Sequence, residues 1–497
     1  MEDTLIPREY PTGKKELLFG LCVLLSAMAL CNFTIYGGFN LGFALGASLC
    51  ILCSAGYLLC SRRKLRFYPA AILALCLVIA ASFARSDDGF VKFVMLCFLT
   101  LGSSLGLCLL AGQNRRNPGR PGTLGDAFFT IFRLGFGEMS PAYRGIKSAF
   151  RRSGSIGQKS TAVLAGVAIA VPILAVMIPL LIWSDAAFEG LMDRLPEFSF
   201  SQLFLTVLFG GALACMLYTQ GTALVHYEKG ETPSQKPRKG LASLTVNTVL
   251  AAVCLVYCVY LVSQLAYFMG GFAGILPQGY TLSQYARRGF FEIAWLCAIN
   301  LGIIALSLGL NRQKDPAPKS TRLLCLFIAL VTEFLVATAS AKMFLYIGSY
   351  GLTRLRVLTE VIMFWLALTT VLVTIRLFLP GFGYMKAVVL TAMLLGTLVL
   401  WADVNTLVAS YNVKAYRSGK LETVDVRHIG TLGAAGVPWL LELAEDKDPQ
   451  VAAQARDILD RRSEYRGHYY TIEDFRGWNY IRSQADQLMD AYMETSE

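Results

Sequence analysis

Histidine and charge are both scarce in this sequence. Only 3 of its 497 residues are histidine and 16% are charged, whereas soluble domains carry about 25% charged residues. The sequence also lacks the zinc-protease helix motif, the nucleophile-elbow motif and the phosphate-binding loop. We therefore expect a protein that is not an enzyme and that holds neither a metal nor a cofactor.

Cysteine is plentiful but is not placed for chemistry. All 13 cysteines precede Leu326, and nearly all lie inside apolar runs, where cysteine behaves as a small hydrophobic residue. The first apolar run follows Lys14 and Lys15 without a small-residue cleavage pattern, and further apolar runs come after it. This run is therefore predicted to be a transmembrane helix and not a signal peptide.

Apolar residues dominate the chain. They make up 55% of it, and its mean hydropathy is +0.52. A helix needs about 20 apolar residues to cross the hydrocarbon core of a membrane. Eleven such stretches lie near residues 16–35, 39–60, 67–84, 90–112, 160–183, 200–224, 241–269, 289–310, 321–347, 354–379 and 384–402. The fold class predicted is all-α, a polytopic transmembrane helical bundle.

Lysine and arginine are distributed unevenly between the loops. The loops on the N-terminal side of the bundle carry 25 of them and the opposite loops carry 4, and such an excess marks the cytoplasmic side. We expect a protein of the bacterial cell membrane with its N-terminus inside and, after eleven spans, its C-terminus outside. The net charge of +11 reflects this topology, so nucleic-acid binding is not expected.

The spans divide the chain into four predicted regions. They are four N-terminal helices at 1–112, a basic cytoplasmic loop at 113–159, seven further helices at 160–403 and an extracytoplasmic helical tail at 404–497. Within the tail, residues 429–461 are typical of two short helices joined by a turn that contains Pro449, like one unit of a helical repeat. A single unit cannot bury its own apolar face, so we expect it to dock on the bundle or on a protein partner.

The 113–159 loop mixes aromatic residues with cations. Phe128, Phe129 and Phe132 stand beside Arg133, and further basic residues lie near its end. Two interpretations stay open. The segment is either an interfacial helix in contact with anionic lipid of the inner leaflet, or a helix that packs beneath the bundle.

Ionisable residues gather in the two apolar runs between residues 321 and 379. An ionisable side chain at membrane depth must be paired or must face water. Lys342 and Glu360 lie a few residues from the turn that joins the runs, and we expect them to form an ion pair. Glu333 lies near mid-membrane and has no cation at its level. It is either a buried neutral carboxyl or part of a polar cavity.

The hydrogen-bond partners expected for a neutral Glu333 are Asn247, Asn300 or Gln264. Upstream, the glycine-rich residues 268–277 are apolar enough to dip into the membrane against other parts of the protein. Arg288 and Glu292 are four residues apart on one helical face, a spacing that suits an ion pair between them. Arg287 is then available to an anionic lipid or a ligand. The candidate functional polar cluster comprises Arg287, Arg288, Glu292, Glu333, Lys342, Arg354, Arg356 and Glu360.

Several separated segments resemble the bacterial multi-pass membrane proteins of domain-of-unknown-function family 4173 and its relative 4153. They are residues 180–188 with Ser184 and Asp185, residues 285–292 with Tyr285 and Gly289, residues 342–346 with Tyr346, residues 350–356 with Gly351 and Thr353, and Asn405 and Asn412 of the tail. The resemblance covers about residues 160–443. It implies a helical membrane architecture and draws attention to these motif residues, but it implies no reaction.

Three functions are consistent with these patterns. The first is a non-catalytic membrane sensor or scaffold whose external tail binds a protein partner. The second is a transporter or flippase-like protein that uses a polar intramembrane site around Glu333, although no internal repeat of the kind many transporters show is visible. The third, an intramembrane enzyme, has no motif to support it.

Overall fold

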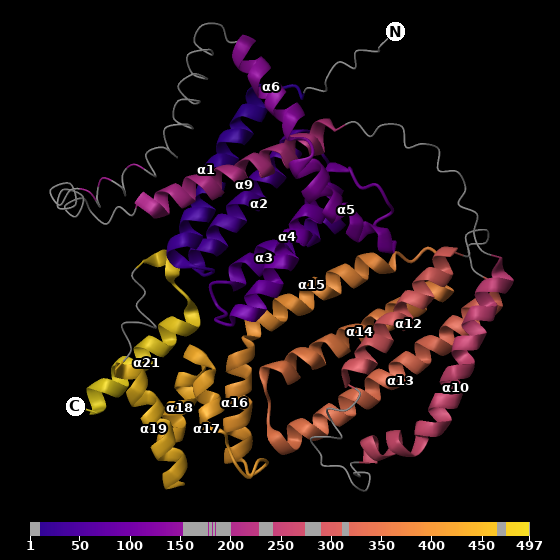
Figure 1. Ribbon diagram of the computed structural model, residues 1–497, viewed down its shortest axis with the longest axis vertical. Coiled ribbons are helices and arrows are strands. Elements are labelled where there is room, and N and C mark those ends of the chain that lie inside the picture. Colours follow the sequence, from indigo (N-terminus) through magenta and orange to yellow (C-terminus); the bar gives the residue numbers. More distant parts are fainter. Residues whose placement is uncertain are drawn as a thin grey trace. The chain divides into compact units, whose positions relative to one another are not determined.

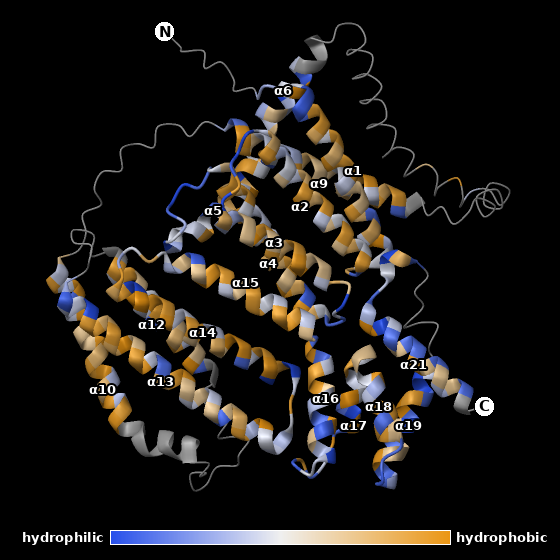
Figure 2. Ribbon diagram, turned by 180° about the vertical axis from the view of Figure 1, so that it is seen from behind, coloured by the Kyte–Doolittle hydropathy of each residue, from blue (hydrophilic) through white to orange (hydrophobic). Residues whose placement is uncertain are grey.

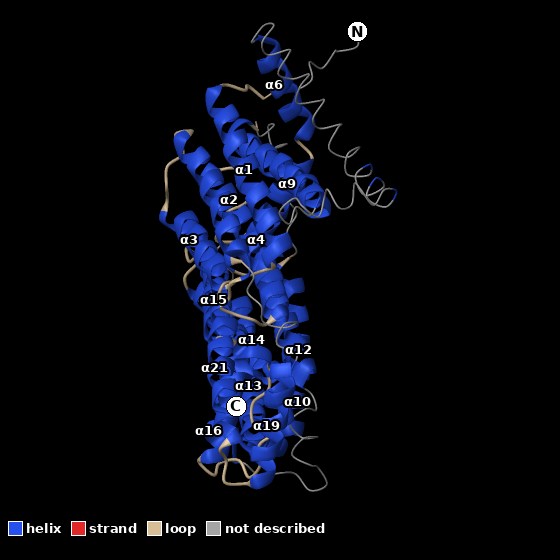
Figure 3. Cartoon of the chain, turned by 90° about the vertical axis from the view of Figure 1, so that its left-hand side faces the viewer, coloured by secondary structure: helices blue, strands red, loops and turns tan. Residues whose placement is uncertain are grey.

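The computed structural model describes residues 10–152, 177, 181, 184, 200–227, 242–273, 290–310, 318–464 and 474–496. Every regular element in these ranges is a helix (Figure 3), which confirms the all-α prediction. The chain divides into two compact units. The first comprises Met1–Arg115, Leu124–Gly230 and Thr471–Ser483, and the second comprises Arg116–Thr123, Glu231–Tyr470 and Gln484–Glu497.

Among its described residues, the first unit has five long helices (Figure 1). They are α1 (Lys14–Gly37), α2 (Leu41–Cys60), α3 (Phe67–Ser82), α4 (Gly89–Ala111) and α9 (Phe200–His226). Helix α1 packs against α2 and α9, and α3 packs against α4. A Cβ atom on Gly46 of α2 would lie 2.5 Å from the Leu30 backbone of α1. This glycine therefore lets the two helices approach closely, as small residues do between membrane helices.

The cytoplasmic loop of the sequence prediction is helical. It forms α5 (Leu124–Phe128), the π-helix η2 (Phe129–Phe136) and α6 (Met139–Arg152). On η2, Leu134 and Ile131 are buried, and the helix packs against α9. Phe132 and Phe136 are at least half exposed, and their rings stack at 6.4 Å. One face of the segment thus packs on the helices of the unit, as one interpretation expected, while the other presents an aromatic surface.

The second unit contains the charged stretch singled out above. Its long helices are α10 (Ser243–Ala273), α12 (Phe290–Leu310), α13 (Lys319–Tyr350), α14 (Arg354–Phe378) and α15 (Tyr384–Ala402). Helix α13 packs against α10, α12 and α14. Its 32 residues extend about 48 Å at 1.5 Å per residue, more than the roughly 30 Å of a hydrocarbon core. Helix α10 continues to Ala273, so the first part of residues 268–277 is helical, and the remainder lies outside the described residues.

The number of spans differs from the prediction. Among the described residues, eight helices are long and apolar enough to cross a membrane, and the helices at Phe67–Ser82 and Glu292–Leu308 are shorter. The stretch predicted at 160–183 falls mostly outside the described residues. The eight long apolar helices are coloured mainly as hydrophobic in Figure 2. Many of their large apolar side chains are exposed, for example Leu255 at 66% and Phe344 at 62%, as side chains that face lipid are.

Short helices make up the tail. Helix α16 (Val404–Arg417) follows α15 after Asp403, and then come α17 (Val426–Thr431), η3 (Gly433–Gly436), α18 (Val437–Ala444) and α19 (Pro449–Glu464). Helix α21 (Tyr480–Ser496) ends the described chain. The hairpin of α18 and α19 packs against α16 and α17, so the apolar face of the repeat-like unit is covered by its neighbours in the same unit.

Candidate functional site

The structure describes only part of the predicted polar cluster. Arg287 and Arg288 lie outside the described residues, as do the motif residues Asp185, Tyr285 and Gly289. Glu292 is exposed in the first turn of α12. Ser184 is described and exposed, and its hydroxyl donates to the Leu181 carbonyl at 3.0 Å. The other residues of the cluster lie at separate heights along α13 and α14.

Glu333 lies beside a polar cluster that joins three helices. The Tyr257 hydroxyl of α10 donates to Asn300 Oδ1 of α12 at 2.6 Å, and Asn300 Nδ2 donates to Thr332 Oγ1 of α13 at 2.9 Å. Asn300 is fully buried. Since buried polar groups contribute stability only when they are paired, this chain of hydrogen bonds fixes the packing of α10, α12 and α13.

The expected partners of Glu333 bond to other groups. Asn300 bonds to Tyr257 and Thr332, and Asn247 bonds to Ser320 and Thr321. The side chain of Gln264 lies outside the described residues. Glu333 Oε1 is buried and has no hydrogen-bond partner among the described residues, although the carboxyl lies close to Cys297 of α12. Asn247 and Asn300 were thus wrongly predicted as its partners, because each bonds to a neighbour at its own level.

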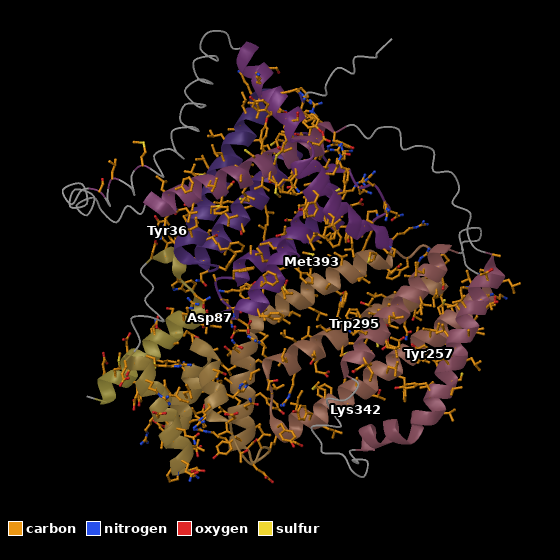
Figure 4. The ribbon with its side chains drawn as sticks, in the orientation of Figure 1. Tyr36, Asp87, Tyr257, Trp295, Lys342 and Met393 are labelled. Carbon is orange, nitrogen blue, oxygen red and sulfur yellow. The ribbon has the colours of Figure 1, made fainter. Side chains whose placement is uncertain are left out.

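The ion pair that the sequence predicted between Lys342 and Glu360 is not formed in the described part of the chain, where Glu360 Oε1 is buried and has no hydrogen-bond partner. Ser340 of α13 lies close to the Glu360 carboxyl. Residues two apart on a helix point about 200° away from each other at 3.6 residues per turn, so Lys342 is directed away from α14 when Ser340 faces it. Lys342 is only 4% exposed, and Figure 4 shows it on α13.

The turn between α13 and α14 is the best-organised part of the predicted cluster. Arg356 lies with its guanidinium 3.9 Å from the centre of the Tyr346 ring, a cation–π contact. Its Nη1 donates to the Tyr350 carbonyl at 3.1 Å and also to the Gly351 carbonyl. These carbonyls end α13, where a positive charge is favourable. Arg354, two residues before Arg356, is exposed.

Asn412 of the tail holds this turn. Its Oδ1 accepts from the Leu352 backbone N–H at 2.6 Å, and its Nδ2 donates to the Leu352 carbonyl at 2.9 Å. Both peptide groups of a turn residue are thereby paired with one side chain, which is itself only 8% exposed. Asn412 was named in the sequence only for its family resemblance. Its role depends on a contact across 60 positions that no local pattern reveals.

Gly351 and Thr353 shape the turn for this contact. Gly351 has φ of +72°, and a Cβ atom there would lie 2.4 Å from Asn412 Oδ1, so both the backbone conformation and the close approach require glycine. Thr353 is the N-cap of α14, and its side chain accepts from the Arg356 N–H at 3.5 Å. Two motif residues of the resemblance therefore have structural explanations.

The tail is a packed module of its own. Arg417 of α16 pairs with Glu442 of α18 at 2.7 Å and also donates to its carbonyl at 2.8 Å. The Tyr416 hydroxyl donates to Asp446 Oδ1 at 3.3 Å. Burial, together with this carboxylate, raises the pKa of Tyr416. Arg462 of α19 donates to the Gly430 carbonyl of α17 and to the Gly433 carbonyl of η3.

Among the described residues, no group of three or more His, Cys, Asp or Glu side chains is arranged to hold a metal ion. The long apolar helices are those of a multi-pass integral membrane protein. The family described as Domain of unknown function (DUF4153) matches residues 67–443, so the chain belongs to this family. No curated protein and no solved structure matches it.

Proposed function

We propose that this membrane protein is a non-catalytic sensor or scaffold whose tail binds a protein partner outside the cytoplasmic membrane. The observation that carries the proposal is the pair of hydrogen bonds from Asn412 to Leu352. They join a folded module to the turn between α13 and α14, the helices that carry Glu333, Lys342 and Glu360. A partner that moves α16 therefore acts directly on these helices.

Contacts at the two ends of α1 in the first unit support the placement of the chain ends on opposite sides of the membrane. The Tyr10 N–H donates to the Pro141 carbonyl near the start of α1, whereas residues 474–482 contact Gly37 and neighbouring residues at the other end of that helix. The 24 residues of α1 extend about 36 Å, enough to cross the hydrocarbon core. This arrangement, with the lysine and arginine distribution, supports an internal N-terminus and an external tail.

Anionic lipid is the partner proposed for the cytoplasmic loop. Phe128, Phe132 and Phe136 are 51%, 61% and 50% exposed on a segment that is too short to span. Arg133 is bound to the buried Glu138 at 2.9 Å, which orients one cation at this surface. Exposed aromatic rings beside cations suit the boundary between anionic headgroups and acyl chains.

A transporter is the second candidate, and one observation favours it. Glu333 Oε1 is buried without a hydrogen-bond partner among the described residues, beside the polar contact of Tyr257, Asn300 and Thr332. A carboxyl in this position is suited to accept a proton or a cation. This candidate makes Glu333 essential, whereas the scaffold makes the connection through Asn412 essential.

Capture of partners from intact cells distinguishes the two functions. The full chain, the Asn412→Ala variant and the Glu333→Gln variant are cross-linked from outside, purified and compared by mass spectrometry. If the protein is a scaffold, Asn412→Ala lowers recovery of the captured partner about tenfold, which corresponds to about 1.4 kcal/mol of binding free energy. Glu333→Gln then leaves recovery of the partner unchanged. If no protein depends on the tail and Glu333→Gln abolishes proton uptake in proteoliposomes, the protein is a transporter.

A further inference from the structure

The segment of residues 474–482, which we name the C-terminal arm, docks within the first unit. It lies between the turn that joins α1 to α2 and the turn that joins α3 to α4. Two backbone hydrogen bonds hold it: the Leu41 N–H donates to the Trp478 carbonyl at 3.1 Å, and the Tyr480 N–H donates to the Ala84 carbonyl at 2.8 Å. The arm thus bonds to both turns through its main chain.

Asn479 is the centre of the contact. It is fully buried. Its Nδ2 donates to the Ser86 carbonyl at 2.9 Å and lies 3.4 Å from Asn40 Oδ1, while its Oδ1 accepts from the Ile481 N–H at 3.1 Å. The Nδ2 group is the donor that the site receives, while Oδ1 accepts from backbone N–H groups of the arm itself and so fixes the arm's own turn. An amide side chain provides both the donor and the acceptor that this arrangement uses.

The pocket around Asn479 is organised by residues of the helices themselves. Lys92 is only 7% exposed, and its Nζ donates to Asn40 Oδ1 at 2.9 Å. Asn40 Nδ2 donates to the Gly37 carbonyl at 2.8 Å, and Asp88 caps α4 by accepting from the Val91 N–H. These bonds do not involve the arm, so the pocket keeps its main polar contacts when the arm is absent. Such preorganisation lowers the cost of binding a peptide.

Two arginines of the C-terminal arm make further contacts with the first four helices and the turns between them on either side of Asn479. Arg482 Nε pairs with Asp87 Oδ1 at 2.7 Å. Arg476 Nη1 donates to Asn32 Oδ1 at 2.9 Å, and the Arg476 guanidinium lies 4.2 Å from the centre of the Tyr36 ring. Figure 4 labels Tyr36 and Asp87 on the first unit. The arm is therefore held at its centre by an amide and near its ends by two arginines.

We propose that this end of the first four helices is a peptide-binding site, selective for an asparagine flanked by arginines, which the chain's own C-terminal arm fills reversibly. The site is separate from the contact between Asn412 and Leu352. A partner peptide with the same pattern would displace the arm and release the end of the tail. The occupant in the resting protein is the arm of the same chain.

Cross-linking tests this proposal in the full chain. Arg85→Cys and Tyr480→Cys, at a pair whose guanidinium and ring centre lie 5.1 Å apart, are introduced together and treated with a short, membrane-impermeant thiol cross-linker, with each single variant as a control. We expect a cross-link within one chain. A synthetic peptide of residues 474–484 should reduce the yield of this cross-link about tenfold, which corresponds to about 1.4 kcal/mol. The same peptide with Asn479→Ala should leave the yield unchanged.

A glycine pair provides a matched control for folding. A Cβ atom on Gly37 would lie 2.3 Å from the Arg476 carbonyl, whereas Gly56 has nothing within 4 Å. Gly37→Val should therefore abolish the cross-link and Gly56→Ala should preserve it, with both proteins purified as monodisperse species. The proposal is overturned by a product of two chains, by no cross-link in the parent double variant, or by a cross-link that neither peptide changes.

Discussion

Replacing Asn412 with alanine will loosen the tail from the membrane helices. The variant removes both hydrogen bonds to the half-buried Leu352 and leaves its backbone donor and acceptor without their protein partner. An unsatisfied buried group costs about 1–3 kcal/mol, so we expect a loss of about 2–4 kcal/mol in the free energy of unfolding. Thermal unfolding in detergent and the rate of proteolysis within α16 measure this loss.

Ser410→Ala is the control on the same helix. The Ser410 hydroxyl donates only to the Leu407 carbonyl of its own helix, and we expect its loss to change stability by less than about 0.5 kcal/mol, as surface substitutions usually do. Equal effects of Asn412→Ala and Ser410→Ala would show that the tail is held to the turn by other contacts.

Gly351→Ala will disrupt the same turn by steric conflict. A residue with a side chain at φ of +72° costs about 1–2 kcal/mol. The new Cβ would lie 2.4 Å from Asn412 Oδ1 and 3.3 Å from Leu421, and overpacking costs about 1–3 kcal/mol. We therefore expect a total loss of about 2–5 kcal/mol, measured by thermal unfolding and by the expression level of folded protein.

Gly348→Ala separates this effect from a general intolerance of substitution. Gly348 lies in the last turns of α13 with nothing within 4 Å of a new Cβ, and alanine in a helix is favoured over glycine by about 0.5–1 kcal/mol. We therefore expect Gly348→Ala not to lower the free energy of unfolding.

The double variant Gly351→Ala, Asn412→Ala should lose less stability than the two single losses added together, because alanine at position 412 lacks the amide oxygen with which the new Cβ at position 351 would clash. Strict additivity would contradict the contact.

The helices themselves follow from composition and run length, because a membrane-spanning segment must satisfy its backbone internally. The direction in which a side chain leaves its helix does not follow from composition or run length. Lys342 and Glu360 were predicted to face each other, but this pair is not formed among the described residues, since the rotation of α13 is set by packing against α10, α12 and α14. Similarly, the amides predicted to bond to Glu333 bond to other groups instead.

Contacts between distant segments were missed altogether. Lys92 falls inside a predicted span and was a readable signal, because a lysine there requires a polar partner. Its connection through Asn40 to Asn479 joins residues hundreds of positions apart, which one sequence does not reveal. The family match at residues 67–443 includes Gly351 and Asn412 but neither Asn40 nor Asn479. The turn contact therefore lies inside the family match, whereas the arm contact depends in part on segments outside it.

Hydrogen exchange at the Leu352 amide tests the central claim most directly, because this N–H donates to Asn412 Oδ1 at 2.6 Å. In the unmodified protein this amide should exchange slowly, together with the amides of α16. In Asn412→Ala its exchange should rise by about tenfold or more, as expected for a loss above about 1.4 kcal/mol, and α16 should lose protection with it. Fast exchange at Leu352 in the unmodified protein, or protection unchanged by Asn412→Ala, would contradict the proposed coupling between the tail and the membrane helices.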